Sequence, residues 1–356
     1  MSLRPAFCWS PSRTSTTRFL SATAYRPSPL RIPLDIPPPF PVAKTCPESS
    51  CSCPPTPPMP AGLPIDYHQP LNGTMAAYAQ QILICTGQRD WASRIEDDGK
   101  HHAWGHLARG LKRLLGRGGR FADPFNNILV SNSSFPPSST STSSSPTASA
   151  FLFPSFRYFP SIPIPPPDST NAGTGLSTFV QAFLLPKQLS AMAESLPETK
   201  KVELTRKPAL ASHFTDAMDL HHSPVILICG HGGRDKRCGV MAPVLETEFQ
   251  SVLRAKGFSS AGSDGNPIDS PGHAHIGLIS HIGGHKYAGN VIVYLPPGMM
   301  MKDSSTSHPL AGKGIWYGRI EPKHVQGVVE ETILGGKVVT DHFRGGIDRS
   351  GNILRL

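Results

Sequence analysis

The sequence predicts an α/β fold, and three observations in its C-terminal part carry that prediction. Residues 224–229 form a continuous apolar run rich in β-branched side chains, which is typical of a central buried strand. Residues 241–256 have apolar side chains at helical spacing, and Gly257 after them favours a helix end. Strand patterns recur at 274–280, 290–295 and 314–317, followed by a helix pattern at 322–334 with proline first and two glycines after. This order is compatible with a thioredoxin-like arrangement.

The preceding part of the chain carries a weaker α/β pattern. It predicts helices at 74–81, 102–115 and 186–196, and strands at 81–85 and 127–130. The run Ile-Leu-Ile-Cys occurs twice, at 82–85 and 226–229, each time before a glycine-containing loop. This echo favours the interpretation that the first folded part is a diverged, thioredoxin-like copy of the second.

Length and composition divide the 356 residues into four parts. Residues 1–35 are rich in Arg, Ser and Thr, which is typical of a mitochondrial transit peptide; a disordered basic tail is the alternative. Residues 36–64 form a proline-rich linker without regular structure. Residues 65–200 form an N-terminal α/β domain, in which a Ser/Thr/Pro tract predicts a disordered insertion at about 131–170. Residues 201–356 form the C-terminal domain.

Composition excludes several classes of protein. Five of the nine excess positive charges lie in residues 1–34, and no basic stripe alternates with aromatic residues, so nothing indicates nucleic acid. No apolar run reaches 18 residues, which excludes a membrane-spanning helix. An odd number of cysteines, seven, favours metal or redox chemistry over a disulfide framework. Nucleotide-binding glycine motifs and Cys-x-x-Cys are absent.

Two short segments combine thiols and imidazoles. Cys229 and Cys238 enclose a Cys-x8-Cys loop after one predicted strand, and His281 and His285 follow another. If the two strands are parallel neighbours, their loops meet at one edge of the sheet. Two Cys and two His can hold tetrahedral zinc, or a [2Fe-2S] cluster with two nitrogen ligands. The paired Cys-x-His and Cys-x-x-His of Rieske proteins is absent.

Other residues near these segments are weaker candidates for ligands or for a role in the site. His231 is a rival ligand, though we expect it to form hydrogen bonds beside the centre. His273 and His275 lie at the start of a strand, where no role is expected. Arg344 and Asp348 lie in a C-terminal tail that we interpret as solvated; the alternative is that they cover the edge of the centre. Two interpretations are equally supported for three further residues: they border the centre, or they pack within a strand. These residues are Trp316, Tyr317 and Arg319.

The remaining cysteines allow three interpretations. The linker contains three of them: Cys46, Cys51 and Cys53. They are exposed reduced thiols, redox thiols that exchange in a flexible segment, or a second metal site completed by His68 or Cys85. Cys85 by itself is typical of a buried core thiol. Cys8 would be removed with the transit peptide.

The Cys229-x8-Cys238 loop, the element His281-Ile-Gly-Gly-His285 and the Trp-Tyr-Gly-Arg run at 316–319 resemble the sucrase/ferredoxin-like family. With the transit-like N-terminus, the resemblance narrows to its fungal altered-inheritance-of-mitochondria branch. It covers roughly residues 46–130 and 180–345. The resemblance implies a thioredoxin-like ferredoxin domain with one [2Fe-2S] cluster on Cys229, Cys238, His281 and His285, and a mitochondrial role in thiol redox quality control. We find no pair of carboxylates that we would assign to glycoside hydrolysis, so the sequence does not support the sucrase activity that the family name contains.

We therefore expect a non-catalytic [2Fe-2S] protein of the mitochondrial matrix or intermembrane space, acting in electron transfer or redox sensing. Because histidine ligands titrate, its potential should fall as pH rises. The alternatives are a zinc-stabilised structural or interaction module with the same four ligands, and a thiol oxidoreductase that uses Cys46, Cys51 and Cys53. The sequence indicates neither the redox partner nor the oligomeric state.

Overall fold

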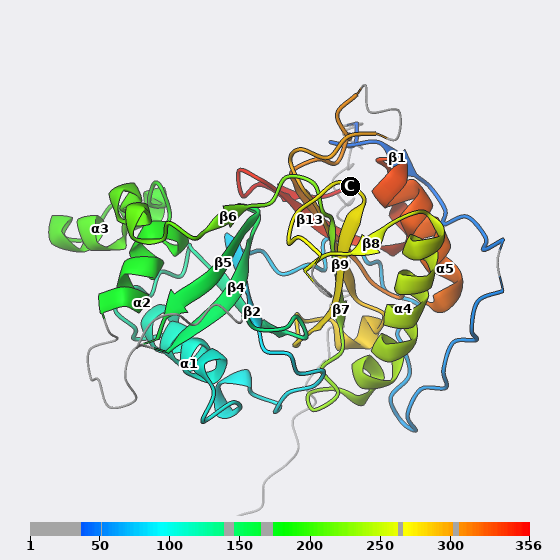
Figure 1. Cartoon of the computed structure of the whole chain (residues 1–356), viewed down its shortest axis with the longest axis horizontal. Helices are drawn as coiled ribbons and strands as arrows, with labels where there is room; N and C mark the ends of the chain where they lie inside the picture. The colour runs from blue at the N-terminus through cyan, green and yellow to red at the C-terminus, as the bar shows by residue number, and fades with distance from the viewer. Residues whose placement is uncertain (1–36, 51, 139–145, 165–173, 263–265, 302–305) are drawn as a thin grey trace, which may run out of the picture. The chain divides into compact units, whose positions relative to one another are not determined.

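A mixed β-sheet with helices packed against it organises the chain (Figure 1). The computed structural model describes residues 37–50, 52–138, 146–164, 174–262, 266–301 and 306–356. The strand order along the sheet is β14-β13-β11-β10-β7-β9-β3-β2-β4-β5-β6. The expected transit peptide at 1–35, with Cys8, and Cys51 of the linker lie outside the described residues.

The C-terminal half has the expected order of elements. These are β7 (Val225–Cys229), α4 (Lys236–Ala255), β9 (His273–Ile279), β10 (Val291–Leu295), β11 (Lys313–Tyr317) and α5 (Pro322–Val328), which continues as a π-helix, Val329–Leu334. β9 pairs parallel to β7, while β10 and β11 follow antiparallel on the other side. Three short strands end the chain: β12 (Val338–Val339), β13 (Phe343–Asp348) and β14 (Ile353–Leu354).

The N-terminal half repeats this order. Its elements are β2 (Gln80–Cys85), α1 (Ala103–Leu115), β3 (Ile128–Ser133), β4 (Thr147–Phe153), β5 (Arg157–Pro163) and α2 (Thr174–Phe179), again continued by a π-helix, Val180–Leu184. The strands pair as β3-β2-β4-β5, which matches β9-β7-β10-β11 in position and direction. The two Ile-Leu-Ile-Cys runs lie in β2 and β7. The two halves therefore share one thioredoxin-like order of elements, which agrees with the interpretation that the first half is a diverged copy of the second.

The remaining elements are short and connect these halves. Strands β1 (Val42–Ala43), β6 (Met218–Asp219) and β8 (Ser259–Ser260) pair with β12, β5 and β9. Helix α3 covers Glu198–Leu204, and 3-10 turns occur at Ile95–Asp97, Ala191–Ala193, Pro208–His213, His285–Tyr287 and Thr340–His342. In the described part of the chain, no helix has the length and apolar character needed to cross a membrane.

The two halves join at the ends of β3 and β9. Ser133 pairs with Ile279, and the backbone N–H of Ser280 donates to the carbonyl of Asn132 at 2.9 Å. Residues 38–356 form one compact unit around this junction. The division into two domains near residue 200 stays a prediction.

Alternation along the strands gives the sheet two apolar faces. Ile226 and Ile228 of β7 belong to the cluster that packs on the helices, and Figure 1 shows α4 and α5 together on one side of β7. Leu227 and Cys229 face a second cluster on the other side, which is rich in aromatic residues. That face is closed by residues 75–78, so the candidate site has a buried wall.

The prediction of a disordered insertion at about 131–170 is wrong for most of the residues that are described there. Residues 147–163 form β4 and β5, a hairpin in which β4 pairs antiparallel with β2. β5 pairs with β4 along its length but with β6 only at Arg157 and Tyr158. Pro160 lies beyond the β6 pairs and beside an irregularity in the β4–β5 register, positions where a strand tolerates proline. Residues 139–145 and 165–170 of that segment lie outside the described chain.

Two expected helices are also wrong. Residues 74–79 are not helical, because the backbone N–H groups of Gly73 and Met75 donate to the carbonyl of Arg344, far away in sequence. Residues 186–196 contain only the 3-10 turn Ala191–Ala193, which Ser190 caps. The linker at 36–64 is irregular as expected in its described residues, apart from the two-residue β1.

Candidate metal centre

The expected ligands lie at the edge of the sheet where β7 and β9 end. β7 ends at Cys229, and Cys238 is the third residue of α4. β9 ends at Ile279, two residues before His281. Cys229 and Ile279 are parallel neighbours, so the loops that follow them leave the same edge. The prediction that these two loops meet is confirmed.

Three of the four expected ligands lie close to one another. The Cys229 thiol interacts with the Cys238 thiol and with His281. Both cysteines are buried, at 2% and 0% exposure. The exposed His285 ring lies beside that of His281, with centroids 5.3 Å apart. Across the described residues, no three Cys, His, Asp or Glu side chains are grouped around a single ion site. The arrangement is a buried thiol pair next to an imidazole pair at the surface.

The two thiols differ in acidity. The hydrogen bond from Cys238 lowers the pKa of Cys229 well below its usual value, and the hydrogen bond and charge of His281 lower it further. The same bond, together with burial, raises the pKa of Cys238. Cys238 also sits in the first turn of α4, where the helix dipole favours negative charge. The pair is therefore suited to hold one thiolate, stabilised by its neighbour.

One ring nitrogen of His281 has no protein partner. Its Nδ1 is buried and lacks a hydrogen bond within the described part of the chain. A buried polar nitrogen without a partner is destabilising by about 1–3 kcal/mol, so it points to a missing ligand. A [2Fe-2S] cluster with two Cys and two His takes its ligands in two pairs, one pair on each iron. The buried thiol pair, with its one acidic member, Cys229, and the unpartnered imidazole nitrogen fit that donor set.

His231 and His275 are engaged in other contacts. Both ring nitrogens of His231 are used: Nε2 donates to the carbonyls of Trp91 and Ala92 at 3.1 and 2.9 Å, and Nδ1 accepts from the His281 backbone N–H at 3.0 Å. His231 thus orients His281, as its expected hydrogen-bonding role implies. His275 bonds to the carbonyl of Ile268 at 2.7 Å, and burial lowers its pKa to about 4.

The loop between His281 and His285 depends on two glycines. Gly283 and Gly284 have φ angles of +85° and +74°, a left-handed conformation that other residues rarely adopt. The amide of Asn290 donates to the carbonyl of Gly284 at 2.9 Å. This double turn places both imidazoles on one side of the loop.

The sequence interpretation preferred a solvated tail for Arg344 over a position at the edge of the centre. Arg344 lies in β13 at 1% exposure, so the expectation of a solvated tail is wrong. Its guanidinium donates to the Gly283 carbonyl, the Asn290 side chain and the Thr74 carbonyl at 3.2, 2.7 and 2.9 Å. Burial lowers the pKa of Arg344 to about 10, while the charges of the two cysteines oppose that shift. Asp348, by contrast, caps the turn after β13 through the N–H of Ser350.

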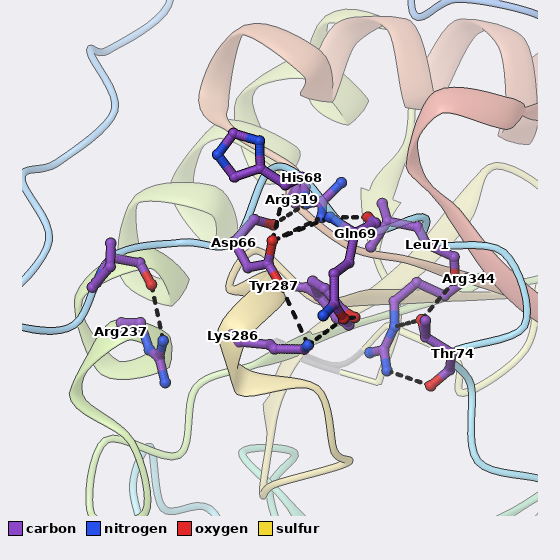
Figure 2. A network of polar contacts seen from close by, with 11 residues as sticks. Asp66, His68, Gln69, Leu71, Thr74, Arg237, Lys286, Tyr287, Arg319 and Arg344 are labelled. Carbon is purple, nitrogen blue, oxygen red and sulfur yellow. Dashed lines mark hydrogen bonds and ion pairs between the residues drawn. The ribbon is translucent and has the colours of Figure 1, made fainter. Parts of the chain in front are cut away.

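Polar contacts hold the segment 64–75 against Arg237, Lys286, Arg319 and Arg344 (Figure 2). The backbone N–H of Asp66 donates to the Lys286 carbonyl at 2.8 Å, and the Asp66 carboxylate forms an ion pair with Lys286 at 3.3 Å. Arg319 donates to the carbonyls of Asp66 and Gln69. Arg237 donates to the carbonyl of residue 64 at 2.9 Å. These contacts tie the segment to both ligand loops.

The aromatic residues at 316–317 pack in the sheet rather than at the surface. Trp316 is 1% exposed and its Nε1–H donates to the Tyr78 hydroxyl at 3.0 Å. The Tyr317 hydroxyl bonds to Thr332 at 2.6 Å. Arg319 has a φ of +58°, an uncommon value for a residue with a side chain, and borders the centre through the segment 64–75.

The described linker thiols lie apart from this centre. The Cys46 thiol contacts the start of α5, 3.5 Å from the carbonyl of His324, and Cys53 is half-buried. Cys85 is buried in β2, where burial raises its pKa to about 12. His68 is exposed on the segment 64–75. A redox role for Cys46, Cys51 and Cys53 stays a prediction.

Cys46 should alkylate slowly. Burial, followed by the charges of Asp341 and Glu331, raises its pKa from 9.0 to about 11, so the thiolate fraction at pH 7 falls by roughly a hundredfold. We expect iodoacetamide to label Cys53 well before Cys46 when the labelled peptides are quantified by mass spectrometry. Equal labelling rates of the two thiols would contradict the structure.

The fold, together with the cysteines and histidines at the ends of β7 and β9, defines an α/β protein with a candidate Cys/His metal centre. The chain belongs to the sucrase/ferredoxin-like family, whose model matches residues 71–345. No solved structure matches the chain.

Curated relatives include several yeast proteins. The chain is 29% identical over 306 residues to Altered inheritance of mitochondria protein 32 of Debaryomyces hansenii, covering 84% of this chain and 94% of the relative. It is 36% identical over 170 residues to the protein of the same name from Meyerozyma guilliermondii, covering 48% of this chain and 50% of that relative. It is 37% identical over 109 residues to Actin patches distal protein 1 of Saccharomyces cerevisiae, 31% of this chain and 29% of that relative. The chain thus spans half of the Meyerozyma protein and nearly all of the Debaryomyces one.

Proposed function

We propose that this protein is a mitochondrial [2Fe-2S] protein that transfers or senses electrons in thiol redox quality control. Cys229, Cys238, His281 and His285 would hold the cluster. The observation that carries the proposal is a buried thiol pair, in which Cys229 has a lowered pKa, beside an imidazole whose Nδ1 has no protein partner in the described chain. Membership of a family described as ferredoxin-like and relatives named for mitochondrial inheritance support it.

The chain's own residues perform three tasks in this proposal. Cys229 and Cys238 supply sulfur donors from inside the protein, where water is excluded. His231 and Arg344 hold the loop of His281 through its backbone, which fixes the direction of the imidazole. The exposed His285 places one ligand at the surface, where an electron-transfer partner can approach. When bound, a [2Fe-2S] group with two nitrogen ligands would supply one-electron transfer at a potential above that of all-cysteine clusters.

The test is the metal content and paramagnetic spectrum of the full chain purified without oxygen. We expect iron and acid-labile sulfide in equal amounts and a signal on reduction. Cys229→Ser and Cys238→Ser should each weaken metal binding by about tenfold or more. Cys46→Ser is the matched control, because that thiol lies against α5 away from the site, and it should keep the wild-type content.

Two outcomes would contradict the proposal. Colourless protein that holds stoichiometric zinc through the same residues would establish the structural-module alternative. Iron that survives the loss of Cys229 and Cys238 would place the metal elsewhere. His281→Cys separates the two metals further, because an iron cluster should keep its colour with a changed spectrum and a lower potential.

A further inference from the structure

A second concave site lies in the N-terminal half, apart from the candidate metal centre. This groove has a volume of about 790 Å³, in the range that small-molecule sites occupy. It is formed by the start of β2, the turn between β4 and β5, parts of residues 182–211, and the turn after β13. We call it the basic groove.

The basic groove carries an excess of positive charge. Its lining contains four cations, Arg157, Lys187, Arg206 and Arg349, and one carboxylate, Asp219. Arg157 already pairs with Asp219 at 2.6 Å. Within the described chain, the other three cations have no carboxylate at ion-pair distance.

Arg206 is the most informative of these cations because it is half-buried. Its Nε donates to the carbonyl of Leu185 at 2.6 Å, which fixes the guanidinium at the wall of the groove. Burial and repulsion from Arg157 both lower its pKa. A desolvated cation beside a like charge is destabilising unless an anion compensates it, and guanidinium groups bind phosphate through two parallel hydrogen bonds.

The floor of the groove is apolar. Leu152 and Phe183, 1% and 6% exposed, line it, and Phe125 lines it with 53% of its surface exposed. A groove that combines an exposed ring with unpaired cations suits a ligand that has an apolar or aromatic portion joined to an anionic group.

We propose that the basic groove binds a phosphorylated small molecule with an aromatic portion. Its phosphate lies between Arg206, Lys187 and Arg349, and its ring lies on Phe125 and the apolar floor. This site is independent of the proposed cluster.

The experiment is calorimetric titration of the full chain with adenosine diphosphate at low ionic strength. We expect saturable one-to-one binding, weakened by added salt, because the contact is largely electrostatic. Adenosine should bind at least about tenfold more weakly, since it lacks the phosphates, and inorganic pyrophosphate should also bind more weakly. If neither adenosine diphosphate nor pyrophosphate binds saturably, the proposal is wrong. Pyrophosphate that binds as tightly as the nucleotide would overturn the role of the apolar floor.

Variants locate the binding. Arg206→Gln and the exposed Arg349→Gln should each weaken nucleotide binding by about tenfold. Arg254→Gln is the matched control, because it removes the same charge from an exposed position on α4 outside the groove. Should Arg206→Gln fail to fold, Arg349→Gln and Lys187→Gln, both at exposed positions, still test the site. Wild-type affinity in these variants, or an equal loss in Arg254→Gln, would overturn the proposal.

Discussion

Replacing Arg344 by methionine should lower the free energy of unfolding by about 3 kcal/mol, since it leaves three acceptors, one buried and two partly buried, without this donor at about 1 kcal/mol each. The acceptors are the carbonyls of Gly283 and Thr74 and the side chain of Asn290. Relief of the buried charge offsets part of the loss, which is why the expected value lies at the low end. Urea unfolding of the metal-free protein measures the effect.

Two further variants define the cause. Arg344→Lys keeps the charge but cannot reach three acceptors with a planar fork, so most of the loss should remain. Arg349→Met removes a similar side chain from an exposed position five residues later and should change stability by less than about 0.5 kcal/mol. A loss in Arg344→Met no larger than in Arg349→Met would show that the guanidinium does not brace the loop.

Gly284→Ala should destabilise the ligand loop far more than Gly283→Ala. Both glycines are left-handed, so each alanine costs about 1–2 kcal/mol of backbone strain. A methyl group on Gly283 meets open space, whereas one on Gly284 overlaps the guanidinium of Arg344. The second substitution must displace a fixed, buried group, so we expect a total near 3 kcal/mol.

The matched pair separates strain from overlap, because only the position of the methyl group differs. Urea unfolding gives the difference in stability, and metal content reports whether His281 and His285 keep their places. Equal effects of the two substitutions would mean that Arg344 does not contact Gly284 in solution.

The parts of the structure that the sequence predicts are those specified locally. The apolar run of β7 and the helical spacing of α4 are readable without knowing their neighbours, and two parallel strands bring their loops together by necessity. The meeting of the two loops was therefore accessible from spacing, while the role of the four residues as ligands stays a prediction. The hydrogen-bonding role expected of His231 agrees with its contacts to Trp91 and His281.

The parts that escaped prediction depend on contacts between distant residues. Thr74 and Arg344 are 270 positions apart, so neither the irregular path of residues 74–79 nor the burial of Arg344 has a local signal. The strands β4 and β5 contain serine, alanine and proline and resemble a loop in composition. Their pairing with β2 supplies the order that their own composition does not.

The junction of the two halves has a consequence for the timing of assembly. Every expected ligand lies after residue 228, but the groups that brace them, the carbonyl of Trp91 and the backbone of Thr74, belong to the first half. Synthesis proceeds from the N-terminus, and early segments fold first. The carbonyl of Trp91 is made early, but the path of residues 73–75 depends on the backbone of Arg344, which is made last. In the proposed function, a metal at this edge would therefore bind only once both ends of the chain have folded together.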